Sequence, residues 1–286
     1  FPFPEFRRAD GCMDADLFIR KGSLTLPSSG FIERRISRYP CHVLYRVDTE
    51  TYYSEWDEGL FLIRNGSEII IDPDPTANEP AIRSIVIGLF GELLRQQGYL
   101  VVHSSSVRIG DTAVLFAGGS EVGKSTTLAA FIRRGYQMIA DDISAIRFED
   151  DRLKVMPSYP SIRLDPAIVN SLDVPLLALS DQPSDGSRLF HRASLADDPV
   201  EISKLFILEW GNTEITSLEP REQFDAVITN SYFGLETGDN GLADSYFGRC
   251  ATLVDHVPVR VLRRERDHSS IDESLDLIEE AVTPAD

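Results

Sequence analysis

The sequence contains little cysteine and no long apolar run, and each absence excludes a class of protein. Its 3 cysteines, Cys12, Cys41 and Cys250, are far apart and form no CxxC pair, so we expect neither a disulfide framework nor a structural zinc site. This use of cysteine fits a reducing, cytoplasmic location. No apolar run approaches the roughly 20 residues that span a bilayer, and the start lacks the pattern of a secretion signal. We expect no membrane association.

Basic residues are also scarce. Against 46 Asp and Glu there are 28 Lys and Arg, of which 4 are Lys, and the net charge is −18. A chain this acidic repels the phosphates of nucleic acid, so we expect no nucleic-acid partner. The length of 286 residues and the 42% of hydrophobic residues are typical of a soluble globular protein with one large domain or two modest ones.

The character of the sequence changes near residue 75. Up to Asp72, short strand-like runs alternate with turn residues, and Asn65-Gly66 between two of these runs indicates a hairpin. A long helix with an apolar stripe is predicted between Asn78 and Gly98, and strands and helices mix after it. We therefore predict an α/β protein with a small antiparallel β region in residues 1–75 and a larger α/β domain in residues 76–286.

One motif in the larger domain is specific for nucleotides. Residues 118–125 fit the pattern GxxxxGK[ST], with an apolar strand-like run before them and a predicted helix after them. The glycines let backbone N–H groups wrap a phosphate, and the helix N-terminus adds a positive partial charge. Lys124 is expected to reach the β- and γ-phosphates, and the Ser125 hydroxyl suits Mg²⁺. The predicted nucleotide-binding residues are Gly118, Gly119, Ser120, Glu121, Val122, Gly123, Lys124, Ser125 and Thr126.

Two acidic residues follow the next predicted strand. Asp141 and Asp142 lie 17 and 18 residues after Lys124, at the end of a short apolar run that we expect to lie beside the P-loop strand. Their carboxylates would then lie at the carboxyl edge of the sheet, next to the phosphates. One carboxylate can hold Mg²⁺, and the other can orient or deprotonate an acceptor hydroxyl.

A histidine precedes the P-loop strand. His103 lies 21 residues before Lys124, in a strand predicted over residues 100–109. Its antiparallel neighbour leads straight into the P-loop, so the ring could approach the phosphates. The alternative is a hydrogen-bonded core histidine with no part in the chemistry.

These motifs together resemble the catalytic domain of the bacterial HPr serine kinase/phosphorylases. The stretch His103-Ser104-Ser105-Ser106-Val107, the P-loop and Ala140-Asp141-Asp142 occur in the order and at the spacing of that family. The resemblance implies a P-loop, HPr-kinase-like fold for residues 76–286 and the use of ATP and Mg²⁺. It also implies that Asp142 is the catalytic base, that His103 and Lys124 are further catalytic residues, and that Ser125 and Asp141 lie on the metal side.

A second resemblance is to the HPr-kinase-like proteins of lasso-peptide gene clusters. Residues 102–107 and the segment Pro157-Ser158-Tyr159-Pro160-Ser161-Ile162-Arg163-Leu164 look like stretches of those proteins. Such kinases phosphorylate a serine of a precursor peptide, so the resemblance implies a peptide or small-protein acceptor. It also adds Arg163 to the catalytic candidates, as a cation near the transferred phosphoryl group. Other candidates for this role are Arg188, Arg192 and Arg260, and a homo-oligomer is left open.

The sequence departs from the kinase family in two places. Glu121 stands where the family usually has glycine in the loop, and a downstream segment with a Mg²⁺-binding glutamate has no match. A reverse phosphorylase activity and HPr itself as acceptor therefore do not follow from the resemblance. Two alternatives remain, which are a small-molecule kinase with the same site and a nucleotide-binding regulatory module without transfer.

Overall fold

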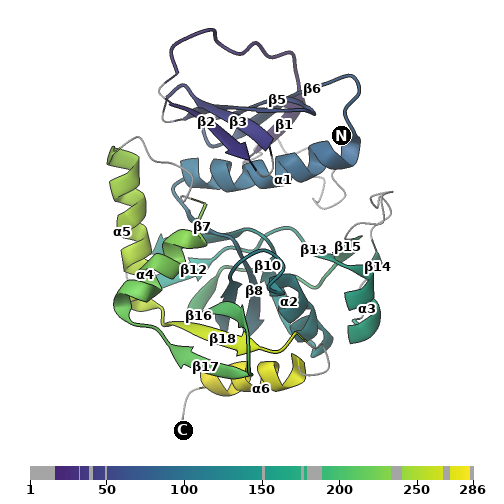
Figure 1. Ribbon diagram of the computed structural model, residues 1–286, viewed down its shortest axis with the longest axis vertical. Coiled ribbons are helices and arrows are strands. Elements are labelled where there is room, and N and C mark those ends of the chain that lie inside the picture. The colour runs from purple at the N-terminus through teal and green to yellow at the C-terminus, as the bar shows by residue number, and fades with distance from the viewer. Residues whose placement is uncertain are drawn as a thin grey trace. The chain divides into compact units, whose positions relative to one another are not determined.

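The computed structural model describes residues 17–31, 33–38, 41–48, 50–149, 152–174, 177–178, 189–232, 240–266 and 271–283. These residues form two compact units, one ending at Tyr99 and the other beginning at Leu100 (Figure 1). Within the described ranges, no helix is long and apolar enough to cross a bilayer.

The first unit is a mainly antiparallel sheet with one long helix against it. All strand pairs are antiparallel except β1 and β6, which run parallel at the edge. Asn65 and Gly66 have positive φ angles of 56° and 58° and form the tight turn that the sequence predicts. The elements are β1 (Phe18–Lys21), β2 (Glu33–Arg38), β3 (Cys41–Arg46), β4 (Thr51–Trp56), β5 (Gly59–Arg64), β6 (Glu68–Pro73) and α1 (Glu79–Gln96), with sheet order β1-β6-β5-β4-β3-β2.

Helix α1 belongs to this first unit. Its apolar stripe, which includes Ile82, Val86 and Leu93, packs with Phe61 and Ile71 of the sheet in one buried cluster. The sequence predicts a boundary between residues 75 and 76, which would place the helix in the second domain, whereas the contacts divide the chain after Tyr99. The stripe shows that the helix must cover an apolar surface, but not which sheet provides it.

The second unit is a mixed α/β domain. Its helices lie on both sides of the main sheet, and β13, β14 and β15 form a separate small antiparallel sheet (Figure 1). The elements are β7 (Leu100–Val102), β8 (Ser104–Ile109), β9 (Thr112–Ala117), α2 (Lys124–Arg133), β10 (Gln137–Ala140), β11 (Ser144–Glu149), β12 (Arg152–Val155), β13 (Ser161–Leu164), α3 (Pro166–Leu172), β14 (Leu177–Ala178), β15 (Leu189–Arg192), β16 (Val200–Trp210), β17 (Glu214–Ser217), α4 (Pro220–Thr229), α5 (Asn240–His256), β18 (Val259–Arg264) and α6 (Ile271–Val282).

Strand direction brings several chain segments to one edge of the main sheet. Strand β16 pairs in parallel with both β9 and β18, and β8 lies antiparallel between β9 and β10. The carboxyl ends of β9, β10, β16 and β18 and the amino end of β8 therefore point the same way. Ligands of α/β proteins bind at such a carboxyl edge.

Two details differ from the sequence analysis. Strand β10 pairs with β8 and not with the P-loop strand β9. The strand predicted over residues 100–109 is interrupted at His103, because β7 pairs with β11 whereas β8 pairs with β9. The backbone N–H of His103 leaves the ladder and donates to the Asn230 carbonyl at 2.7 Å.

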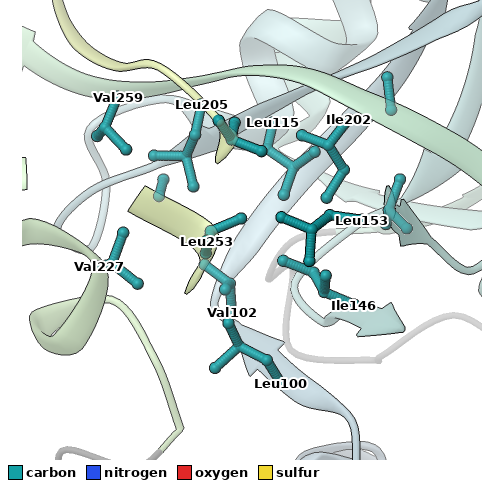
Figure 2. Close-up of a cluster of buried hydrophobic side chains, with 14 of the residues drawn as sticks. Leu100, Val102, Leu115, Ile146, Leu153, Ile202, Leu205, Val227, Leu253 and Val259 are labelled. Atoms are coloured by element: carbon teal, nitrogen blue, oxygen red, sulfur yellow. The ribbon is translucent and has the colours of Figure 1, made fainter. Parts of the chain in front are cut away.

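Buried clusters on the two faces of the sheet hold it between helices. Leu115, Leu205 and Val259 of the central strands face Val227 of α4 and Leu253 of α5 (Figure 2). On the other face, the rings of Phe116 and Phe131 of α2 stack with their centroids 5.7 Å apart, and Leu275 of α6 packs into the same cluster. The edge that carries the site is thereby fixed from both faces.

Candidate active site

The loop between β9 and α2 has the backbone conformation of a phosphate-binding loop. Gly118 and Gly123 have φ angles of 138° and 94°, which disfavour any residue with a side chain. A Cβ atom at Gly118 would lie 2.9 Å from the Leu208 carbonyl oxygen, and one at Gly123 would overlap the Arg264 guanidinium. Both glycines of the motif are therefore required by the packing around the loop. Between them, Val122 turns its side chain into the core.

Glu121 also has a left-handed backbone, with a φ angle of 61°. Glycine adopts this conformation freely, whereas a residue with a Cβ atom is strained by about 1–2 kcal/mol. The glutamate side chain is exposed, and it lines the cavity described below. Glutamate in place of glycine at position 121 therefore adds both backbone strain and a negative charge beside the loop.

The Lys124 side chain is folded onto the loop itself. Its ammonium group donates to the carbonyl oxygens of Gly118 at 2.9 Å and Gly119 at 3.1 Å. The residue is 7% exposed. The cation is thus held within the loop, where the phosphates of a bound nucleotide would lie.

Asp141 is the buried carboxylate of the site. It is 3% exposed, and it accepts hydrogen bonds from Ser105 Oγ at 2.6 Å, from Ser125 Oγ at 3.0 Å and from the Arg163 backbone N–H at 3.4 Å. Burial and the charge of Asp142 raise its pKa to about 7, which the hydrogen bonds only partly offset. The sequence analysis did not single out Ser105, although strand alternation places it on the opposite face from Ser104 and Ser106.

The oxygen pair of Ser125 and Asp141 fits magnesium. Mg²⁺ prefers hard oxygen ligands, and it is commonly held by one or two protein groups together with waters and phosphate oxygens. Among the described residues, no group of three or more His, Cys, Asp or Glu side chains forms a metal cluster. The residues therefore suit an ion that arrives with the nucleotide better than a fully protein-ligated metal.

Asp142 directs its side chain into the cavity. Its φ angle of 64° belongs to a tight turn in which the Ile143 N–H donates to the Asp141 carbonyl at 2.8 Å. A positive φ angle together with a hydrogen bond between residues i and i+2 is the geometry of a classic γ-turn, which is strained and is typical of functional sites. The turn therefore separates the two acids, because Asp141 is buried against Ser125 whereas Asp142 is half-buried and lines the cavity.

His103 lies beside Asp142 and is not an isolated core residue. Burial and the Lys124 ammonium lower the pKa of His103, whereas the nearby Asp142 carboxylate and backbone oppose them. The ring also lies 6.3 Å from the ring of Tyr232, between centroids. The histidine is therefore neutral at neutral pH and lines the cavity.

Of the arginines predicted to lie near the transferred phosphoryl group, one lines the cavity. Arg163 on β13 lines the cavity, and its backbone holds Asp141. Arg192 on β15 and Arg260 on β18 do not line the cavity. Arg188 lies outside the described residues.

Three contributors were missed by the sequence analysis. Asn230, at the end of α4, accepts from the Gly118 N–H at 2.8 Å with its side chain, and its carbonyl accepts from the His103 N–H at 2.7 Å. Trp210 and Arg264 end the parallel strands β16 and β18 and lie opposite each other in register. The sequence does carry a sign of the last two, because both strands end in a large aromatic or charged residue at the edge where the P-loop lies.

A cavity of about 740 Å³ lies at this edge of the sheet, beside the P-loop. This volume is typical of small-molecule sites. Of the predicted residues, it is lined by His103, Ser120, Glu121, Gly123, Lys124, Ser125, Thr126, Asp142 and Arg163.

Comparison with known proteins gives a distant structural likeness. No protein-family model matches the chain, and no curated protein matches it. Among solved structures, the chain is similar to the Hpr(Ser) kinase/phosphatase from Coxiella burnetii, over 64% of this chain and 93% of that chain, with 16% identity and a TM-score of 0.33. A likeness this distant cannot carry the function, which therefore rests on the site.

Proposed function

We propose that this protein is an ATP- and Mg²⁺-dependent kinase that transfers the γ-phosphoryl group to a serine hydroxyl of a peptide or small protein. The observation that carries the proposal is the convergence of the P-loop, Asp142 and His103 at one cavity, with the buried Asp141 accepting at 3.0 Å from Ser125, which also lines that cavity. A binding module needs the loop, but it has no use for a second, cavity-facing carboxylate.

Asp142 serves as the base in this reaction. It accepts the proton as the acceptor O–H bond breaks, the hydroxyl oxygen bonds to the γ-phosphorus, and the bond from that phosphorus to the bridging oxygen of ADP breaks. Neutral His103 lies beside Asp142 at the same cavity and supports the turn. It does so without adding a charge that would neutralise the base.

The phosphates are held by Lys124, the loop amides and the start of α2. Magnesium, when bound, supplies positive charge for the β- and γ-phosphate oxygens. Ser125 and Asp141 are the residues that would hold it. Arg163 is placed to add a cation on the γ-phosphate side of the cavity.

The peptide acceptor, a lasso-peptide precursor in particular, is proposed from the resemblance of residues 102–107 and 157–164. A small-molecule acceptor would use the same base and the same loop. A cytoplasmic location remains a prediction from the composition.

The test is single-turnover transfer from γ-³²P-labelled ATP, with saturating magnesium, to a serine peptide library and separately to a metabolite pool. Asp142→Asn keeps the size and polarity of the side chain but removes the proton acceptor, so transfer should fall by about 10²–10⁴. Nucleotide affinity should persist or rise, because one negative charge near the phosphates is gone.

Asp165→Asn is the matched control. Asp165 is an exposed carboxylate at the cavity rim that caps α3 by accepting from the Ala167 N–H at 2.8 Å, and asparagine caps equally well. Undiminished transfer by Asp142→Asn would remove Asp142 from the mechanism. Nucleotide binding by the wild type without transfer to any acceptor would favour a regulatory module.

A further inference from the structure

Arg264 is a buried cation whose charge no described acid compensates. It is 1% exposed, and within the described ranges it has no ion pair and burial alone acts on its charge. Its Nη2 donates to the carbonyl oxygens of Val122 at 3.2 Å and Gly123 at 3.5 Å, whereas Nε and Nη1 are buried without a partner in the described part of the chain. Buried charges are normally paired, so this arrangement requires an explanation.

The surroundings of Arg264 are built to hold it in that position. Its guanidinium carbon lies 4.5 Å from the centroid of the Trp210 ring, a favourable cation–π distance. In its present position the guanidinium fills the space that a Cβ atom of residue 123 would occupy. The loop, the end of β16 and the end of β18 therefore all adapt to a positive charge at this point.

The position of Arg264 in the sheet indicates which part of a ligand it serves. His103 and Asp142 lie beside β8 and β10, on one side of the P-loop strand β9. Trp210 and Arg264 end β16 and β18, on the other side of β9. All four residues line the same cavity. One end of the cavity, which we call the chemical end, carries His103 and Asp142, the opposite end carries Trp210 and Arg264, and the loop lies between them.

We propose that Arg264 is a second cation of the phosphate site, which compensates the phosphate nearest the nucleoside, the α-phosphate of the bound nucleotide. This inference rests on the proposed function, in which the γ-phosphate faces Asp142 and Lys124 serves the β- and γ-phosphates. The phosphate chain then extends away from Asp142, and the first anion at the opposite end is the α-phosphate.

Burial also acts on the charge of Arg264 itself. Burial lowers the pKa of Arg264 to about 10, which still leaves the guanidinium charged at neutral pH. In the free protein the uncompensated charge is therefore a cost, and a bound phosphate removes that cost.

Two variants test the inference, with inorganic tripolyphosphate, AMP, ADP, ATP and adenosine as probes in calorimetric titrations. Arg264→Met removes the charge and fills the same apolar space, and the affinities for AMP, ADP, ATP and tripolyphosphate should fall about 10- to 100-fold while that for adenosine is unchanged. Arg264→Lys keeps the charge and should recover part of the loss.

The control is Arg263→Met. Arg263 precedes Arg264 on the same strand, but its side chain is paired with Glu209 and Glu214, both at 3.0 Å, outside the cavity. Its loss should change phosphate affinity less than threefold.

Thermal unfolding separates phosphate binding from a merely structural role. Without ligand, Arg264→Met should melt at or above the wild-type temperature, because an uncompensated charge has been removed. A lower melting temperature for unliganded Arg264→Met would assign the residue to loop support and overturn the inference.

Unchanged ATP and tripolyphosphate affinities in Arg264→Met would also overturn the inference and leave the proposed kinase intact. A wild type that binds tripolyphosphate through Arg264 but transfers nothing from ATP would overturn only the proposed function. A wild type that binds neither ligand would overturn both.

Discussion

The buried carboxyl group of Asp141 should make the free protein less stable as the pH rises. Burial, with the Asp142 charge, raises its pKa from 3.8 to about 7. Between these values the folded protein keeps a proton that the unfolded chain has released, so the free energy of unfolding falls with rising pH. Each pKa unit corresponds to about 1.4 kcal/mol, and the rise of about three units therefore amounts to about 4 kcal/mol at pH 8.

Asp141→Asn isolates this contribution. The asparagine oxygen can still accept the hydroxyls of Ser105 and Ser125, but the side chain no longer titrates. We expect urea unfolding, measured without magnesium or nucleotide at intervals from pH 4.5 to 8, to show the wild type losing about 3 kcal/mol relative to the variant over this range. A difference between the two proteins that stays constant with pH would refute the reasoning.

The neighbouring acid supplies a second check. Asp142→Asn removes the charge that adds to the burial of Asp141, so the pKa of Asp141 should fall. The pH at which stability is lost should therefore move downward in this variant. An unmoved midpoint would leave burial as the sole cause.

Two further variants test the loop. Lys124→Ala should lower MgATP affinity about 100-fold by calorimetry, because it removes the cation that would bind the phosphates and that now bonds to the Gly118 and Gly119 carbonyls. The control is Lys154→Ala, which breaks a surface ion pair with Glu149 and should leave MgATP affinity unchanged. Glu121→Gly should raise the free energy of unfolding by about 1 kcal/mol and tighten ATP binding, since it relieves the left-handed backbone and removes a charge. Glu121→Gln removes only the charge, so an equal gain in stability from both changes would contradict the backbone argument.

Local patterns of the sequence were sufficient for the loop and its flanks. The β8–β9 hairpin, helix α2 from Lys124 and the turn at Asn65-Gly66 depend on residues close together in the chain. The structure places His103 and Asp142 at the edge that carries the loop, but Asp142 follows a strand that pairs with β8 and not, as the sequence predicts, with β9. Their roles in transfer remain predictions.

The rest depends on contacts that the sequence does not encode locally. The long helix α1 could have covered either sheet, and β10 could have paired with β9 or with β8. Arg263 and Arg264 are adjacent and chemically identical, yet one forms surface ion pairs and the other lines the cavity. Only the register of β18 against β16 decides which of them turns inward.

Asn230 connects two parts of the site through hydrogen bonds. Its side chain accepts from the first amide of the loop, at Gly118, and its carbonyl accepts from His103, where β7 and β8 separate. Because both amides depend on one residue at the end of α4, fraying of that helix end would release them in the same opening event. The phosphate-binding loop and His103 thus form one cooperative unit. A partner that binds and stabilises α4 would make the opening of both less frequent.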